Sequence, residues 1–208
     1  MTSKKMLGSV SLWVVALGAA GGIGCGGEAT GPQLSGDVEE IGAVNAAICP
    51  PAAPSPSLVV PSGERLAFSF DAVGVQIYAC AASGSGVGWV FQAPEATLLN
   101  PGGQTAGTHF AGPTWQANDG SQVVGARVAS VTVDPSAVPW LLLSAASHAG
   151  AGRMAKVSFI QRFETVGGTA PAAGCDATTA GALSRVPYQA TYYFYEPKQG
   201  APQGPSCP

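Results

Sequence analysis

Apolar and polar residues alternate along most of the central part of the chain. The alternation covers residues 65–70, 73–79, 87–91, 157–161 and 188–195. A period of two with many Val, Phe and Tyr residues is typical of half-buried β-strands. Residues 123–133 form a further β-rich run, and Trp140 to Leu143 are apolar on every side. The last segment is predicted to be a buried strand or a short buried turn of helix.

Gly-rich segments separate these runs and predict tight turns. They are Ser83-Gly84-Ser85-Gly86, Asn100-Pro101-Gly102-Gly103, Asn118-Asp119-Gly120 and Gly150-Ala151-Gly152. Short strands divided by such turns indicate an all-β fold with few or no helices. We expect one antiparallel domain of seven to ten strands, built as a sandwich or a barrel, with the sandwich favoured.

Composition divides the chain into four parts. Residues 1–24 are predicted to be an export signal, and residues 25–57, rich in Gly, Ala, Pro and Ser, a tether. The β domain is expected to cover residues 58–196, with a Pro-rich tail at 197–208. The share of apolar residues, 46%, is enough for a core.

The first 25 residues resemble the signal of a bacterial lipoprotein. Lys4 and Lys5 precede an apolar stretch that ends in small residues just before Cys25. The resemblance implies cleavage before Cys25 and lipid on its sulfur, although Gly22 stands where the usual pattern has Leu. The alternative is an uncleaved N-terminal anchor. Lipidation would tether the protein to a membrane, so we expect an exported cell-envelope protein, on the outer membrane or the cell surface.

The charge of the chain argues against nucleic acid as a partner. The net charge is −3, from 9 basic and 12 acidic residues. Removal of the signal takes away two of the basic residues and none of the acidic ones, so the charge becomes −5. A protein without a basic patch has no electrostatic attraction to phosphate backbones.

Five cysteines are present, and four remain if Cys25 carries lipid. An even number in an exported chain predicts disulfides. We favour the pairs Cys80–Cys175 and Cys49–Cys207, because the first two lie in the β domain and the last two in its flanks. A zinc site is the alternative. It is disfavoured because there is no Cys-x-x-Cys, and His109 and His148 fit no ligand spacing.

Several strings together resemble domain-of-unknown-function family 3455, a group of exported bacterial and fungal proteins. They are GVQIYAC (74–80), WVFQAPEA (89–96), HFAGPTW (109–115), NDGS (118–121), VPWLLL (138–143), IQR (160–162), TVGG (165–168) and GCD (174–176). The resemblance covers about residues 58–196. It implies no reaction and no catalytic residues.

The segment from Glu95 to Ser121 holds the candidate catalytic residues. A hydrolase acting on carbohydrate could use His109 as a base and Glu95 and Asp119 as paired carboxylates. Structural roles are favoured for each of them. Asp119 lies in a turn signal, and Glu95 could anchor a loop, paired to Arg162. His109 could be a hydrogen-bonded histidine packed under Trp115.

A second group of residues could hold a ligand. Aromatic walls with a few polar groups are typical of small-molecule sites. The candidates are Gln76, Trp89, His109, Trp115, Trp140, Gln161 and Arg162. A core role is the favoured alternative for the tryptophans, because a β domain of this size needs large aromatic side chains inside.

These observations favour a non-enzymatic binding or structural module of the cell envelope, without a cofactor or a metal. A small molecule or a glycan is the expected ligand. The rival hypothesis is an envelope hydrolase that uses Glu95, His109 and Asp119.

Overall fold

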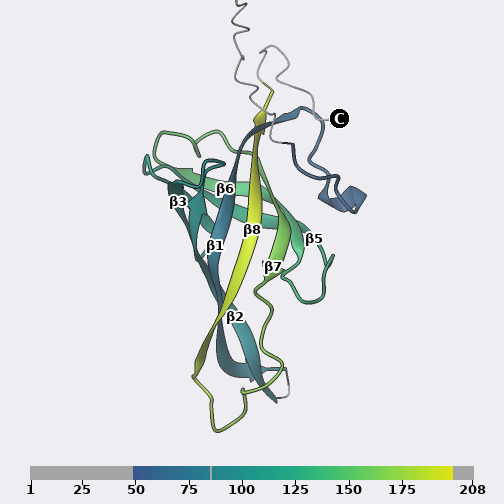
Figure 1. Cartoon of the computed structure of the whole chain (residues 1–208), viewed down its shortest axis with the longest axis vertical. Helices are drawn as coiled ribbons and strands as arrows, with labels where there is room; N and C mark the ends of the chain where they lie inside the picture. Colours follow the sequence, from purple (N-terminus) through teal and green to yellow (C-terminus); the bar gives the residue numbers. More distant parts are fainter. Residues whose placement is uncertain (1–48, 85, 199–208) are drawn as a thin grey trace, which may run out of the picture. The chain divides into compact units, whose positions relative to one another are not determined.

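A computed structural model describes residues 49–84 and 86–198. A short 3-10 helix, η1 (Pro56–Leu58), precedes eight strands (Figure 1). The strands are β1 (Glu64–Ser83), β2 (Gly86–Leu99), β3 (Thr105–Phe110), β4 (Thr114–Ala117), β5 (Gln122–Val131), β6 (Trp140–Ala149), β7 (Phe159–Gly167) and β8 (Leu183–Pro197). Within these residues, no helix combines the length and hydropathy needed to cross a membrane.

The eight strands form one closed antiparallel barrel in chain order. Each strand pairs with the next, and β8 pairs with β1 to close the ring. The all-β prediction is confirmed, and the architecture is the barrel rather than the favoured sandwich. The pairing that decides between the two joins residues more than 100 positions apart, such as Phe70 and Tyr192. Local turn signals do not specify such a contact.

Three strands continue beyond the barrel as an extension that we call the arm. It consists of residues 75–83 of β1, 86–95 of β2 and 183–187 of β8. In this region β2 has no pairing with β3 and β8 has none with β7. The arm is the narrow lower part of the sheet in Figure 1.

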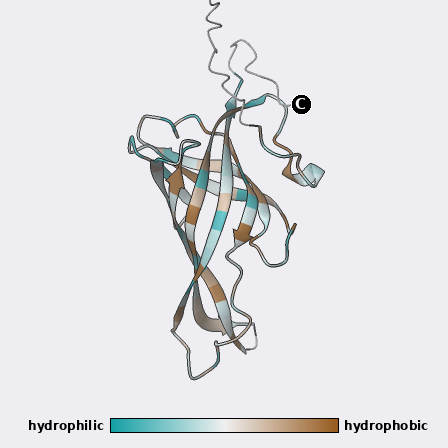
Figure 2. Cartoon of the chain, in the orientation of Figure 1, coloured by the Kyte–Doolittle hydropathy of each residue, from teal (hydrophilic) through white to brown (hydrophobic). Residues whose placement is uncertain are grey.

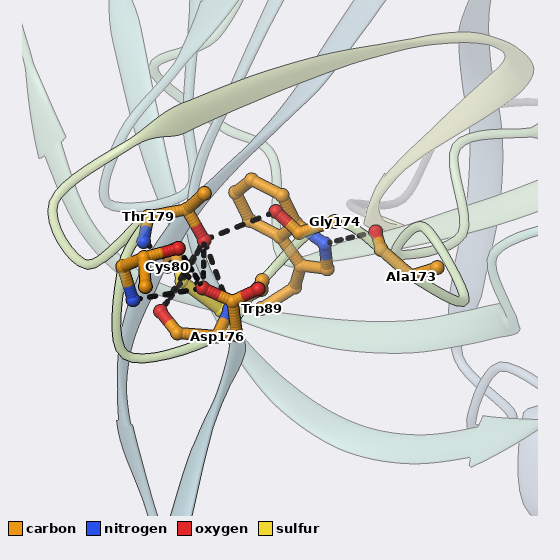
Figure 3. Close-up of a disulfide and its surroundings, with 8 residues drawn as sticks. Cys80, Trp89, Ala173, Gly174, Asp176 and Thr179 are labelled. Atoms are coloured by element: carbon orange, nitrogen blue, oxygen red, sulfur yellow. Dashed lines mark hydrogen bonds between the residues drawn. A yellow bond between two sulfur atoms is a disulfide. The ribbon is translucent and has the colours of Figure 1, made fainter.

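The loop between β7 and β8 is fastened to the arm by a disulfide (Figure 3). Cys80 and Cys175 form the predicted bond, with 5.3 Å between their Cα atoms and a sequence separation of 95. Near it, Trp89 Nε1 donates a hydrogen bond to the carbonyl of Ala173 (3.0 Å). Closer to the barrel, Tyr78 donates its hydroxyl hydrogen to the carbonyl of Gly168 (2.6 Å). The loop is therefore held along the length of the arm.

The barrel interior is filled with aromatic and aliphatic side chains toward one end. Phe68 stacks on Phe194 with ring centroids 4.7 Å apart, and Phe70 packs edge-on to Phe194. The connection between β6 and β7 covers this end, because Met154 and Val157 are buried in the same cluster. We call it the closed end.

Strand β8 is buried on both faces, as its aromatic residues predict. Tyr192 and Phe194 belong to the inner cluster, whereas Tyr193 and Tyr195 belong to a second cluster on the outside of the barrel. Leu58 completes the outer cluster with no exposed surface. Because Gln161 Nε2 donates to the carbonyl of Leu58 (2.7 Å), the segment before β1 is held on the barrel wall.

Strand β1 turns an unexpected face inward. Polar and apolar residues alternate along it (Figure 2), yet the buried positions include Gln76 and Tyr78, while Val73 is 47% exposed. A bulge between Leu66 and Phe68 also places Leu66 against the outer cluster. A bulge shifts the alternation by one residue, so it changes which side chains face the interior.

Several predictions fall outside the described residues. They are the signal at 1–24, the lipid site Cys25, most of the tether at 25–57, most of the tail at 197–208, and Cys207, the expected partner of Cys49.

Candidate functional site

A pocket of about 570 Å³ lies at the end of the barrel from which the arm extends. All eight strands contribute to it, through residues that include Gln76, Pro94, His109, Trp115, Arg127, Leu143, Arg162 and Tyr192. Small-molecule sites usually have volumes of about 300–1,000 Å³. An eight-stranded barrel is just wide enough to hold one small ligand. The pocket thus has the size and place of a ligand site.

Several residues in this region carry a buried polar atom without a hydrogen-bond partner. Among the described residues they are Gln76 Nε2, Trp115 Nε1, Tyr188 Oη and Tyr192 Oη. Three of the four residues line the pocket. A buried polar group that makes no hydrogen bond costs about 1–3 kcal/mol. Such groups are therefore expected to meet a ligand or water.

Tyr188 and Tyr192 are neutral hydroxyls at physiological pH. Burial raises the pKa of both phenols, and each influences the pKa of the other. Arg162 acts in the opposite direction on both. Tyr188 is close to Gln76 and Tyr192, and Tyr192 is also close to Arg162, but none of these contacts has the geometry of a hydrogen bond. Tyr192 lines the pocket, so its hydroxyl can still donate to a bound group.

Arg162 is held in place by the backbone. Its Nε and Nη2 both donate to the carbonyl of Pro139, at 3.1 and 2.7 Å. Two ion pairs, Arg65–Glu196 and Arg185–Glu95, occur among residues 49–84 and 86–198, and Arg162 is in neither. The predicted pairing of Glu95 with Arg162 is therefore wrong. Arg162 brings an uncompensated positive charge to the pocket.

His109 is a buried, uncharged part of the pocket. Its ring stacks on Trp115 at 4.4 Å, and Nδ1 lies 2.9 Å from the carbonyl of Thr114. A carbonyl only accepts, so Nδ1 carries the proton and Nε2 keeps its lone pair. Burial lowers the pKa of His109 to about 3, against the opposing effect of the Thr114 hydrogen bond. His109 is therefore neutral at pH 7.

The two candidate carboxylates are not beside His109. Glu95 precedes Ala96, the register partner of His109, so its side chain points to the opposite face of β2. Glu95 instead pairs with Arg185 at 2.6 Å on the surface. The hydrogen bond from Arg185 and its charge lower the pKa of Glu95.

Asp119 has a structural role at the β4–β5 turn. It accepts hydrogen bonds from Ser121 Oγ (2.5 Å) and from the backbone N–H groups of Ser121 and Arg153. These bonds, that of Ser121 Oγ foremost, lower the pKa of Asp119 to about 2. Asp119 fastens the β6–β7 connection that covers the closed end, and it does not line the pocket.

The candidate ligand-binding residues separate into two groups. Gln76, His109, Trp115 and Arg162 line the pocket. The other three have structural contacts. Trp89 binds the β7–β8 loop, Trp140 stacks on Phe163 at 4.5 Å, and Gln161 accepts from Tyr195 Oη on the outside of the barrel.

Sequence reasoning did not select some of the residues that line the pocket. They include Phe91, Arg127 and Tyr192. Arg127 lies within a β-rich run, and a single charged residue in such a run was the feature of the sequence that could have marked it as a site residue. Phe91 reaches the pocket because a bulge between Ile77 and Tyr78 shifts the β1–β2 register.

The arrangement does not suggest a metal centre. In the part of the chain that the structure describes, no three His, Cys, Asp or Glu side chains lie close enough to share an ion.

By fold, this protein is a closed up-and-down β-barrel with a ligand-sized pocket at one end. It belongs to the family described as "Protein of unknown function (DUF3455)", whose sequence profile matches its residues 61–196. No curated protein and no solved structure is a significant match to the chain.

Proposed function

We propose that this protein is a non-enzymatic binding module of the cell envelope. It holds a small molecule in the pocket at the arm end of the barrel. A lipid on Cys25 anchors it to the membrane, on the outer membrane or the cell surface.

The unpartnered polar atoms of the pocket carry this proposal. Gln76, Trp115 and Tyr192 are each no more than 2% exposed, yet each keeps a polar atom without a hydrogen-bond partner. A protein that needed the barrel only as a scaffold would gain stability from apolar side chains at these positions. Their presence beside a cavity favours a ligand that forms the missing hydrogen bonds.

Export is supported by the cysteine chemistry. The Cys80–Cys175 disulfide is typical of oxidising compartments outside the cytosol. The basic and apolar N-terminal segment before Cys25 supports the same location.

Binding is favoured over hydrolysis by the surroundings of His109. A general base of this kind is usually oriented by a carboxylate and titrates near the working pH. His109 instead bonds to a backbone carbonyl, and burial lowers its pKa to about 3. Glu95 and Asp119 are engaged elsewhere.

The binding function can be tested on full-length protein purified from its native membrane. We expect native mass spectrometry to find a small molecule bound to it, and that molecule to raise the melting temperature of ligand-free protein by mass action. Tyr192→Phe should weaken this shift, because it removes one unpartnered donor. Tyr195→Phe is the matched control, since it removes a hydroxyl that bonds to Gln161 outside the barrel.

Two results together would contradict the proposal. The first is native protein without any bound compound. The second is a panel of glycans and metabolites in which no member changes the melting temperature.

The lipid anchor has its own test. We expect the mature N-terminal peptide to begin at Cys25 and to carry the mass of attached acyl chains. Cys25→Ser should abolish both the modification and the membrane association. A Cys25→Ser protein that remains in the membrane fraction would show that another segment anchors it.

A further inference from the structure

We infer that the pocket takes an organic anion, in which a carboxylate or phosphate group is attached to an aromatic or other apolar body. This inference rests on the proposed binding function and names the chemistry of the ligand.

The unpartnered groups of the pocket call for hydrogen-bond acceptors. Trp115 Nε1 and Gln76 Nε2 can only donate, and the neutral Tyr192 hydroxyl can donate. A ligand that satisfies them must therefore bring acceptor atoms. Carboxylate and phosphate groups have several acceptor oxygens and form the strongest hydrogen bonds with such donors.

The charge of the pocket is opposite to the charge of the protein. Arg127 and Arg162 line it, and no acidic side chain does. The whole chain is acidic, with a net charge of −3. Neither arginine forms an ion pair with the carboxylates of the described residues. An anion would therefore compensate a positive charge that the protein leaves uncompensated.

The sheet register brings the two arginines to the same region. Arg127 is the partner of Leu143 on one side of β6, and Arg162 is the partner of Leu141 on the other. Leu141 and Leu143 are two residues apart, so they lie on the same face of β6. The two arginines are thus separated by two strand spacings across the sheet and by two residues along it, which places their backbones roughly 12 Å apart. Their long side chains can approach one anionic group from both sides.

The remaining walls fit an apolar body. His109 is stacked on Trp115, and Tyr78 meets Phe91 edge to face at 5.7 Å. Leu141 and Leu143 add aliphatic surface from β6. Since His109 is neutral, it presents an aromatic surface rather than a further charge. Flat or branched apolar groups pack well on such walls.

The inference can be tested with matched pairs of probes measured by isothermal titration calorimetry. The first pair is naphthalene-2-acetate and naphthalene-2-acetamide, which differ in charge and have nearly the same shape. The second is 2-naphthyl phosphate and 2-naphthol. We expect at least one anion to bind about tenfold or more tightly than its neutral partner, since hydrogen bonds to charged groups are the stronger ones. The two pairs distinguish a carboxylate site from a phosphate site.

Arginine variants show whether the pocket is the source of this preference. Arg162→Gln should bring the affinity ratio of anion to neutral probe close to one. Arg127→Gln should lower the ratio as well, and Arg127 is exposed, so this variant is expected to fold even if Arg162→Gln does not. Arg65→Gln is the matched control. Arg65 pairs with Glu196 and does not line the pocket, so the ratio should stay unchanged.

Three results with the probes would overturn the inference. The members of both pairs could bind equally, the ratio could persist in both pocket variants, or no probe could bind up to its solubility limit. A neutral compound that co-purifies with the native protein would also overturn it, and would leave the proposed binding function intact. Native protein without a bound compound, together with a metabolite panel that leaves the melting temperature unchanged, would instead contradict the proposed binding function.

Discussion

The surroundings of His109 hold it uncharged in the barrel. The residue is 2% exposed, and its ring packs against both Trp115 and Tyr192. Protonation would place a positive charge in this buried position, near Arg162. In the unfolded chain the imidazole is in water, so its protonation carries no such cost. His109 therefore links the stability of the fold to pH.

Acid is expected to weaken the fold through His109. The pKa of this histidine is about 3 in the folded protein and about 6.5 in the unfolded chain. The stabilising effect is complete above pH 6.5 and is lost as the pH falls toward 3, because only the unfolded state takes up the proton in this range. The free energy of unfolding should fall by about 2–3 kcal/mol between pH 6.5 and pH 4.5.

Guanidinium denaturation at several pH values would measure this loss. His109→Phe, which keeps a ring against Trp115, should lose less stability over the same pH range than the wild type. An equal loss in both proteins would assign the pH dependence to other groups.

Some of the individual residues were predictable from sequence and others were not. The packing of His109 on Trp115 was among the structural roles proposed from the sequence, and the two rings do stack. The inward direction of Gln76 was not predictable in this way, because its strand carries the more apolar residues on the opposite face. Which face is buried depends on the pairing of the strand with both neighbours, and that information is non-local.

At the scale of elements, the arm depends on close contact between β1 and β2. Gly74 lies where the arm leaves the barrel, opposite Ala96 in the register. A Cβ at Gly74 would lie 2.1 Å from the carbonyl oxygen of Glu95 and 2.5 Å from the Cα of Ala96. Both atoms belong to backbone, which cannot move away as a flexible side chain can. Gly74 is therefore required for the two strands to meet at this point.

Substitution of two glycines in the same hairpin tests this requirement. Gly74→Ala should lower the free energy of unfolding by about 2 kcal/mol or more, because overpacked sites force the backbone to shift. Gly86→Ala should change it by less than about 0.5 kcal/mol, since nothing lies within 4 Å of the added methyl group. Thermal and chemical denaturation of both variants would measure the difference. Equal stability of the two would show that β1 and β2 separate more easily than their register suggests.

Element existence was easier to predict than element length. The turn signals correctly separate β1 from β2, β2 from β3 and β4 from β5. Residues 65–70 and 73–79 look like two strands, yet they form the single strand β1 of 20 residues. The short strands β3 and β4 were hidden by their polar and glycine residues, and their pairing with long neighbours explains why they form.

At the scale of the whole barrel, the structure has an outer cluster as well as an inner one. The segment before β1 covers apolar side chains of β6, β7 and β8 on the outside of the wall. Leu58 is its central residue and is fully buried. The wall is thus stabilised from both faces.

Truncation of Leu58 tests the outer cluster. Leu58→Ala should reduce the free energy of unfolding by about 2–5 kcal/mol, as is usual for a buried leucine. The adjacent Val59 is 57% exposed, so Val59→Ala should cost much less. Urea denaturation would compare them. If both cost the same, the segment before β1 would not be packed on the barrel in solution.

The sequence predicted the class of fold better than its closure or its site. Alternating residues and turns are local signals, and they specify antiparallel strands. The closed ring and the pocket depend on β1 meeting β8, and on residues from all eight strands coming together. The pocket therefore contains residues such as Arg127 and Tyr192, whose common location only the barrel reveals.

The pairing of the first strand with the last has a consequence for biosynthesis. The barrel cannot close until β8 has left the ribosome, because β8 pairs with both β1 and β7. Topologies that join distant parts of a chain also fold slowly. A nascent chain of this design thus cannot complete its fold until synthesis is nearly finished.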